Sequence, residues 1–328
     1  MISFNDCNWL HNPFNNINFE NLNHSIIING PEGIGKKLLT KKIISTLTNL
    51  NNVSLNEEDV HPDIFILNRD KILINQISYR ETKNKKTKPK WDELKGKRDL
   101  LNFIALSPVK AKNKVAALIN ADKIERRTQN VLLKTLEEPP DHAYIILTTS
   151  RPRVLLDTIY SRSHVINLKP LSNEDKDLWL KSIGLSEYNS YDFPSYYSPI
   201  QIYNEIANNN QSNFKEFISI LDRHFSRSES QKNIIKDIMD MDIDAIIKLN
   251  FFVEFLKIIL DSKLRNVTFS GIYKTFALYS FSNLKISNLI LEINQMRQDL
   301  YSVPQINEGH MLNVIMSYNV IPMQYCNN

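Results

Sequence analysis

The chain has 328 residues, of which 42% are hydrophobic, so it is long enough for two or three domains with their own cores. Its net charge of +4 is too small to indicate nucleic-acid binding by itself. No apolar run of about 18 residues predicts a membrane span, and the first residues, MISFNDCNWL, predict no secretory signal. Cys7 and Cys326 are too few for a disulfide framework or a cysteine-based zinc site, which fits a reducing cytoplasm.

The first 169 residues alternate short apolar runs with helical patterns. Five runs rich in β-branched residues predict strands over residues 24–30, 61–68, 114–120, 143–149 and 164–168. Apolar residues at helical spacing predict helices over residues 36–50, 98–106 and 126–138, and residues 153–162 predict a short helix and a turn. Because the strands are apolar throughout, the pattern predicts a parallel sheet with helices on both faces.

After Pro170 the pattern becomes helical. A capping box at Ser172 and Asp175 predicts a helix over 171–184, and the loop-rich segment that follows turns helical near Pro199. Apolar stripes further on predict a buried helical core, such as Phe251, Phe252, Phe255 and Ile259. We therefore expect an α/β domain over 1–169, a small helical domain over 170–210 and a helical domain over 211–328.

Three of the seven glycines fall in the segment GPEGIGKK, residues 30–37, between the first predicted strand and the first predicted helix. This spacing is typical of a phosphate-binding loop, in which backbone N–H groups and a lysine hold nucleotide phosphates. A tight strand-to-helix turn would explain the same glycines without a ligand. We treat Gly30, Gly33, Gly35 and Lys36 as candidates for binding ATP or ADP.

Two positions lack the groups that an ATPase uses to hold Mg²⁺. Lys37 stands where the loop usually has Ser or Thr, and a second ammonium there repels a divalent cation. Asn120 stands at the end of the third predicted strand, where hydrolysis requires an acid, and Asp122 comes two residues later. We therefore expect neither a bound metal nor intrinsic ATP hydrolysis. Thr148 and Thr149, which end the fourth predicted strand, are further candidate nucleotide contacts.

Two basic features each have two interpretations. Arg162 precedes the last predicted strand, away from the glycine loop, where it could reach a neighbouring subunit's nucleotide as an arginine finger. Its spacing alone favours an ordinary surface ion pair. The Lys-rich block over residues 83–98, with Trp91 for stacking, could contact DNA, but runs of charge are usually solvated surface.

Several motifs follow one another over residues 24–164: HSIIINGPEGIGKK, HPDIFIL, FIALSPVKAKNKVAALINADKI, LLKTLEEPP and ILTTSRPRVLLDTIYSRS. In this order they resemble the bacterial clamp-loader subunits of the AAA+ class, and most closely the delta-prime family of the DNA polymerase III clamp loader. The resemblance implies a AAA+ P-loop domain, a small helical lid domain and an all-α collar domain.

The resemblance also implies a function. Subunits of this kind are non-hydrolysing stators of the DNA polymerase III holoenzyme, which assemble with delta and tau/gamma subunits. Through that complex they act on the sliding clamp and on primed DNA. Carried over, this makes Ser161 and Arg162 the pair that acts in trans on ATP bound by the neighbouring subunit, so that no nucleotide of the chain's own is required.

The chain departs from the family pattern at three places. Ser163 replaces the cysteine that usually ends the Ser-Arg-Cys motif. Residues 50–63 contain no cysteine where many members have a zinc module, so we expect no zinc. Gln201 stands near the position where the lid of active relatives carries an arginine that contacts ATP.

Two other functions stay open at this point. The chain could be an active ATPase motor subunit of the gamma/tau kind, or another AAA+ remodeller, although Lys37, Asn120 and Gln201 oppose this. It could also be a stand-alone DNA-binding protein that uses the 83–98 block, which the mild net charge disfavours.

Overall fold

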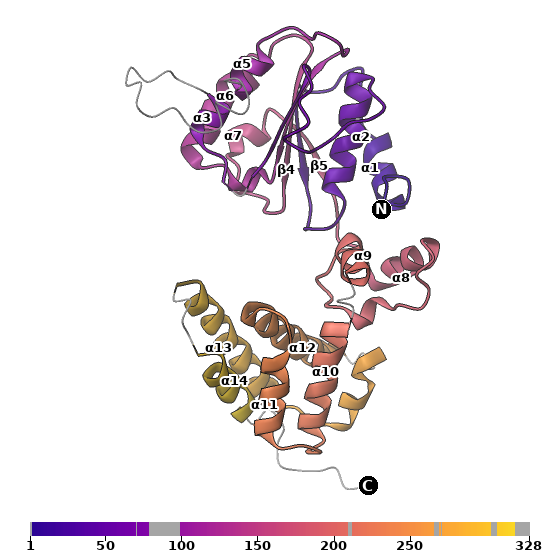
Figure 1. Cartoon of the computed structure of the whole chain (residues 1–328), viewed down its shortest axis with the longest axis vertical. Coiled ribbons are helices and arrows are strands. Elements are labelled where there is room, and N and C mark those ends of the chain that lie inside the picture. The colour runs from indigo at the N-terminus through magenta and orange to yellow at the C-terminus, as the bar shows by residue number, and fades with distance from the viewer. Residues whose placement is uncertain are drawn as a thin grey trace. The chain divides into compact units, whose positions relative to one another are not determined.

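The computed structural model describes residues 2–69, 71–78, 99–208, 212–265, 269, 271–302 and 307–318. The chain divides into two compact units, Met1–Leu171 and Ser172–Asn328 (Figure 1). The expected further division near residue 210 falls within the second unit, and the three-domain scheme stays a prediction. The Lys-rich 83–98 block, with Trp91, lies outside the described residues.

The first unit is built on a parallel five-stranded sheet in the order β2-β3-β4-β1-β5. Its strands are β1 (Ser25–Asn29), β2 (Ile64–Asn68), β3 (Lys114–Ile119), β4 (Ala143–Thr149) and β5 (His164–Asn167). Every residue of β1 and β3 is buried, because helices cover both faces of the sheet. The predicted fold class, a parallel α/β domain followed by a helical region, is confirmed.

The order in which the chain visits the strands decides which face of the sheet each helix covers. It runs from β1 to the far edge at β2 through α2 (Lys36–Thr48), and then returns through β3 and β4 to β5. Since such crossovers are right-handed, the reversal places the returning helices on the opposite face. Figure 1 shows α2 on one side of the sheet and the returning helices on the other: α3 (Ile74–Ile77), α5 (Leu100–Ile104), α6 (Arg126–Glu137) and α7 (Asp157–Tyr160).

The same connections create a crevice at the carboxyl ends of β1 and β4. These strands are neighbours, but the chain leaves them in opposite directions and over opposite faces of the sheet. Ligands of open α/β sheets bind at such switch points. Gly30 and Ser150, which directly follow the two strands, therefore lie at the mouth of the crevice.

The short helix and turn predicted within residues 153–162 are present, and the helix, α7, covers Asp157–Tyr160. Arg153 has a left-handed φ of 75°, which a helix does not accommodate. The buried Gln129 satisfies backbone groups of the turn before α7: its Oε1 accepts from the Leu156 N–H at 2.9 Å and its Nε2 donates to Val154 O at 3.3 Å. This long-range contact is not visible in the local pattern.

The second unit is helical in its described residues. Its main helices are α8 (Asn173–Ser182), α9 (Pro199–Ala207), α10 (Ser212–Phe225), α11 (Gln231–Asp240), α12 (Ala245–Arg265), α13 (Asn283–Ser302) and α14 (Glu308–Ser317). The N-cap half of the predicted capping box is present, with Asp175 N–H donating to Ser172 Oγ at 3.1 Å, while the Asp175 carboxylate accepts from the Ser172 hydroxyl at 2.9 Å. The predicted α12 stripe is buried and packs edge to face with aromatic rings of α10 and of the short helix η4 (Gly271–Leu278).

Candidate functional site

The glycine loop connects β1 to α2, and each of its glycines has a structural reason. Gly33 and Gly35 have φ angles of 71° and 101°, in the left-handed region that favours glycine. A Cβ atom on Gly30 would lie 2.9 Å from Leu168 Cβ and 3.0 Å from Leu168 O, so only glycine lets the end of β5 pass here. The turn thus explains the glycines without excluding a phosphate.

Lys36 is bound by its own loop. Its side chain is buried, and Nζ donates to Gly30 O at 2.7 Å, to Pro31 O at 2.8 Å and to Ser150 Oγ at 2.8 Å. Burial lowers the pKa of Lys36 to about 8, although the negative charges of Glu32 and Asp122 oppose this. The ammonium already has three acceptors, so a phosphate could bind it only by displacing some of them.

Lys37 lies on the first turn of α2 and is exposed. It lines a shallow hollow together with Lys41 and residues 52–55, and its charge contributes to the lowered pKa of Lys36. The loop therefore has two neighbouring ammonium groups and no hydroxyl at the position where Mg²⁺ is usually held.

Asn120 redirects the chain after β3. It has a left-handed φ of 60°, and its N–H donates to Thr148 Oγ1 at 3.0 Å. This turn brings the Asp122 carboxylate to the end of β4, where Oδ1 accepts from Thr149 Oγ1 at 3.1 Å and from the Ser150 N–H at 3.3 Å. Ser150 therefore connects the acid to Lys36. Counted along an extended strand, Asp122 would lie two residues beyond the position of the usual acid. The turn after β3 brings its carboxylate back to the end of β4.

The two threonines and Ser150 have different surroundings. Thr148 and Thr149 are fully buried and their hydroxyls bind neighbouring protein groups, so their assignment to nucleotide contact stays a prediction. Ser150 is only half-buried and contacts Lys36, although sequence reasoning missed it. Its position directly after β4, matching that of Gly30 after β1, was the available signal.

The described ranges contain no group of three or more His, Cys, Asp or Glu side chains that could hold a metal ion. Within the same ranges no helix is both long and apolar enough to cross a membrane.

Arg162 lies at the other end of the sheet from the glycine loop. In the parallel register His164 of β5 is opposite Ile26, so the turn before β5 lies at the amino ends of the strands. The glycine loop follows their carboxyl ends. Arg162 therefore lies away from the glycine loop of its own unit, as predicted from the alternation of strands.

The guanidinium of Arg162 has defined partners. Nη2 forms an ion pair with Glu137 Oε1 at 2.8 Å, and Nη1 donates to Thr158 O at 3.0 Å and to Ser161 Oγ at 3.4 Å. Ser163, in place of the usual cysteine, donates to Ile159 O at 2.7 Å. The predicted surface ion pair is present, but 35% of the arginine side chain stays exposed, which leaves room for a second partner.

Gln201 caps its own helix. Its Oε1 accepts from the Ser198 N–H at 2.9 Å, which satisfies a donor at the start of α9. The Gln201 amide is uncharged, so it cannot replace the positive charge that an arginine would offer to a phosphate. The expectation that this position has lost a nucleotide contact agrees with this geometry but stays a prediction.

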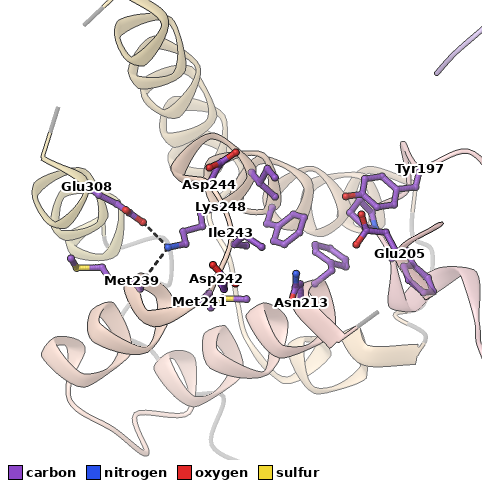
Figure 2. Close-up of a pocket in the computed structure, with 15 residues that line it drawn as sticks. Tyr197, Glu205, Asn213, Met239, Met241, Asp242, Ile243, Asp244, Lys248 and Glu308 are labelled. Carbon is purple, nitrogen blue, oxygen red and sulfur yellow. Dashed lines mark hydrogen bonds and ion pairs between the residues drawn. The ribbon is translucent and has the colours of Figure 1, made fainter. Parts of the chain in front are cut away.

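The second unit contains a cavity of about 490 Å³, which Figure 2 shows. Acidic side chains line it: Glu205, Asp242, Asp244 and Glu308. The buried Lys248 extends across part of this lining and donates to Met239 O at 3.0 Å and to Glu308 Oε1 at 2.9 Å. Lys248 thus ties the end of α11 and the start of α14 to α12, and we interpret this part of the lining as structural.

A glycine loop, a lysine and an acid at the switch point of a parallel sheet give the first unit the architecture of a P-loop fold. Residues 10–172 match a family model described as "DNA polymerase III, delta subunit". The first unit of this chain therefore belongs to the clamp-loader family of DNA polymerase III.

Curated relatives include gamma, tau and delta-prime subunits. The gamma subunit of Buchnera aphidicola (Acyrthosiphon pisum) is 26% identical over 227 residues, 69% of this chain and 58% of that protein. The tau subunit of Escherichia coli is 28% identical over 167 residues, 49% of this chain and 24% of that protein. The delta-prime subunit of Haemophilus influenzae is 39% identical over 85 residues, 26% of each chain.

These matches cover less than two thirds of the relatives' own lengths. A solved structure of a gamma-subunit-related protein from Thermotoga maritima aligns with 89% of this chain and 92% of its own, at 17% identity and a TM-score of 0.44.

Proposed function

We propose that this chain is the non-hydrolysing stator of the sliding-clamp loader, the delta-prime type of subunit. One observation carries the proposal: the loop's lysine is held by the loop's own carbonyls, and Lys37 stands where the magnesium-binding hydroxyl would be. Such a loop can keep the fold of a nucleotide site without turning over ATP.

As a stator, the chain would act through its partners. We propose that these are delta and tau/gamma subunits, and that it reaches primed DNA and the sliding clamp only through their complex, in the cytoplasm. Its own contribution would be the partly exposed Arg162, presented with Ser161 to ATP on the adjoining subunit. The chain would require no zinc and no nucleotide of its own.

The test is reconstitution with the cognate delta and tau/gamma subunits. Size-exclusion chromatography should show the chain eluting in one complex with them, and the isolated chain should release no ADP from Mg·ATP. A turnover by the isolated chain that disappears in the Lys36→Ala variant would contradict the stator assignment.

A second candidate is an active ATPase subunit of the gamma/tau kind. Two observations favour it: the gamma match extends over 69% of this chain, and the Asp122 carboxylate lies one side chain away from Lys36. A metal held between Asp122 and a nucleotide would need Lys37 to point away. The same turnover assay separates the two candidates.

We expect Lys36→Ala to change the ATPase rate of the reconstituted complex by less than about twofold, because the proposed role uses no nucleotide at this loop. The change removes the ammonium group that donates to three acceptors, two of which are in the glycine loop. The unfolding free energy of the isolated chain should therefore fall by about 1–3 kcal/mol. Urea denaturation measures this loss. The exposed Lys37→Ala variant is the control and should unfold like the unaltered protein.

A further inference from the structure

Glu137 is the last residue of α6, and it faces Arg162 in the turn between α7 and β5. Its Oε1 lies 2.8 Å from Arg162 Nη2, and half of its side chain is exposed. The carboxylate thus comes from a different helix than the other groups that bind the guanidinium.

Helix stability does not explain a carboxylate at this position. The carboxyl end of a helix carries partial negative charge, so glutamate is disfavoured there. An exposed ion pair also contributes little to folding because water screens both charges. Folding stability therefore gives little reason for Glu137, and the contact left to explain is its ion pair with Arg162.

The guanidinium is held on two sides. The turn itself supplies Thr158 O and Ser161 Oγ to Nη1, and α6 supplies Glu137 to Nη2. Among the described residues, the Nε–H and one Nη2–H of Arg162 have no partner. A planar guanidinium with free donors on its exposed part is suited to phosphate oxygens, and holding it in advance reduces the entropy lost on contact.

We infer that Glu137 is the positioning residue of Arg162, and that its carboxylate keeps the guanidinium in the orientation that reaches the neighbouring subunit's phosphate. This inference rests on the proposed function. A competing role is that Glu137 withholds the arginine from the phosphate. The two roles predict opposite signs, because removing a positioning group slows the neighbour and removing a competitor speeds it up.

The experiment measures steady-state ATP hydrolysis by the complex reconstituted with its cognate ATPase subunits. With Glu137→Gln we expect kcat to fall about tenfold while KM for ATP is unchanged, since the arginine acts in the transition state and not in ATP binding. The matched control is Glu138→Gln, the same change at the next, exposed residue, and it should leave both constants within twofold.

A double-mutant cycle separates positioning from a general structural role. In an Arg162→Ala background, Glu137→Gln should cause no further loss, because nothing is left to position. An equal loss in both backgrounds would overturn the inference, and so would an increase in rate or an unchanged kcat. If Arg162→Ala alone had no effect, the proposed function itself would fail, so the two failures are distinguishable.

Discussion

Arg162→Ala should lower ATP hydrolysis at the adjoining subunit's site about 10³-fold, the lower end of what an arginine finger contributes. The reason is electrostatic: the guanidinium would neutralise charge that develops on the transferred phosphoryl group, and alanine leaves that charge unbalanced. Clamp loading by the reconstituted complex should fall with it. Single-turnover hydrolysis and loading of labelled clamp onto primed DNA measure the two effects.

Folding should not change, since Arg162 is part of an exposed ion pair whose loss costs at most about 1 kcal/mol. Arg162→Lys should recover little, because lysine keeps the charge but not the planar fork of donors. Arg127→Ala, at an exposed position on α6, is the control and should behave like the unaltered chain. A complex with Arg162→Ala that hydrolyses ATP and loads clamps at the normal rate would remove the finger assignment.

Asp63→Asn should destabilise the first unit by about 3–5 kcal/mol, the usual cost of breaking a buried charge pair. Asp63 is completely buried and accepts hydrogen bonds from the N–H groups of Val109, Lys110 and Ala111 at 2.6–2.8 Å. It also accepts from the buried Lys114 Nζ at 3.3 Å, and the substitution removes the carboxylate that pairs with this lysine. Urea denaturation of the full chain measures the loss.

The same carboxylate predicts a pH dependence. Burial by itself would raise the pKa of Asp63, but the backbone donors and Lys114 outweigh it and lower the pKa to about 2. The unfolded chain has a pKa near 3.9, so the stabilisation is complete above about pH 4 and is lost as pH falls towards 2, by roughly 2–3 kcal/mol. Asp63→Asn should lack this part of the acid sensitivity. The exposed Asp59→Asn is the control, and an unchanged acid profile in Asp63→Asn would contradict the prediction.

The strands and the glycine loop could be predicted because their causes are local. A strand buried on both faces must be apolar along its whole length, and left-handed turns favour glycine, so β1, β3 and the loop at Gly33 and Gly35 leave clear patterns. The buried α12 stripe is likewise visible in the spacing of its aromatic residues.

The contacts that depend on distant residues could not be predicted. The link from Asp122 through Ser150 to Lys36 needs the left-handed turn at Asn120 and the pairing of β1 with β4. Neither can be inferred from spacing along the chain. The ion pair between Glu137 and Arg162 joins α6 to a turn 25 residues later in the sequence. Gln129 of α6 likewise makes side-chain hydrogen bonds to the backbone of Val154 and Leu156.

The placement of Arg162 and the glycine loop at opposite ends of β5 and β1 gives the domain a polarity. Domains of this kind that hand an arginine to a neighbour must all do so in the same direction, so contacts between them are head to tail rather than two-fold symmetric. A row assembled in this way has two unlike ends. A subunit that donates an arginine but hydrolyses no ATP of its own needs a neighbour on one side only, so it can occupy only one of the two ends. Its position in the row would then follow from which groups it carries, independently of the shape of its surfaces.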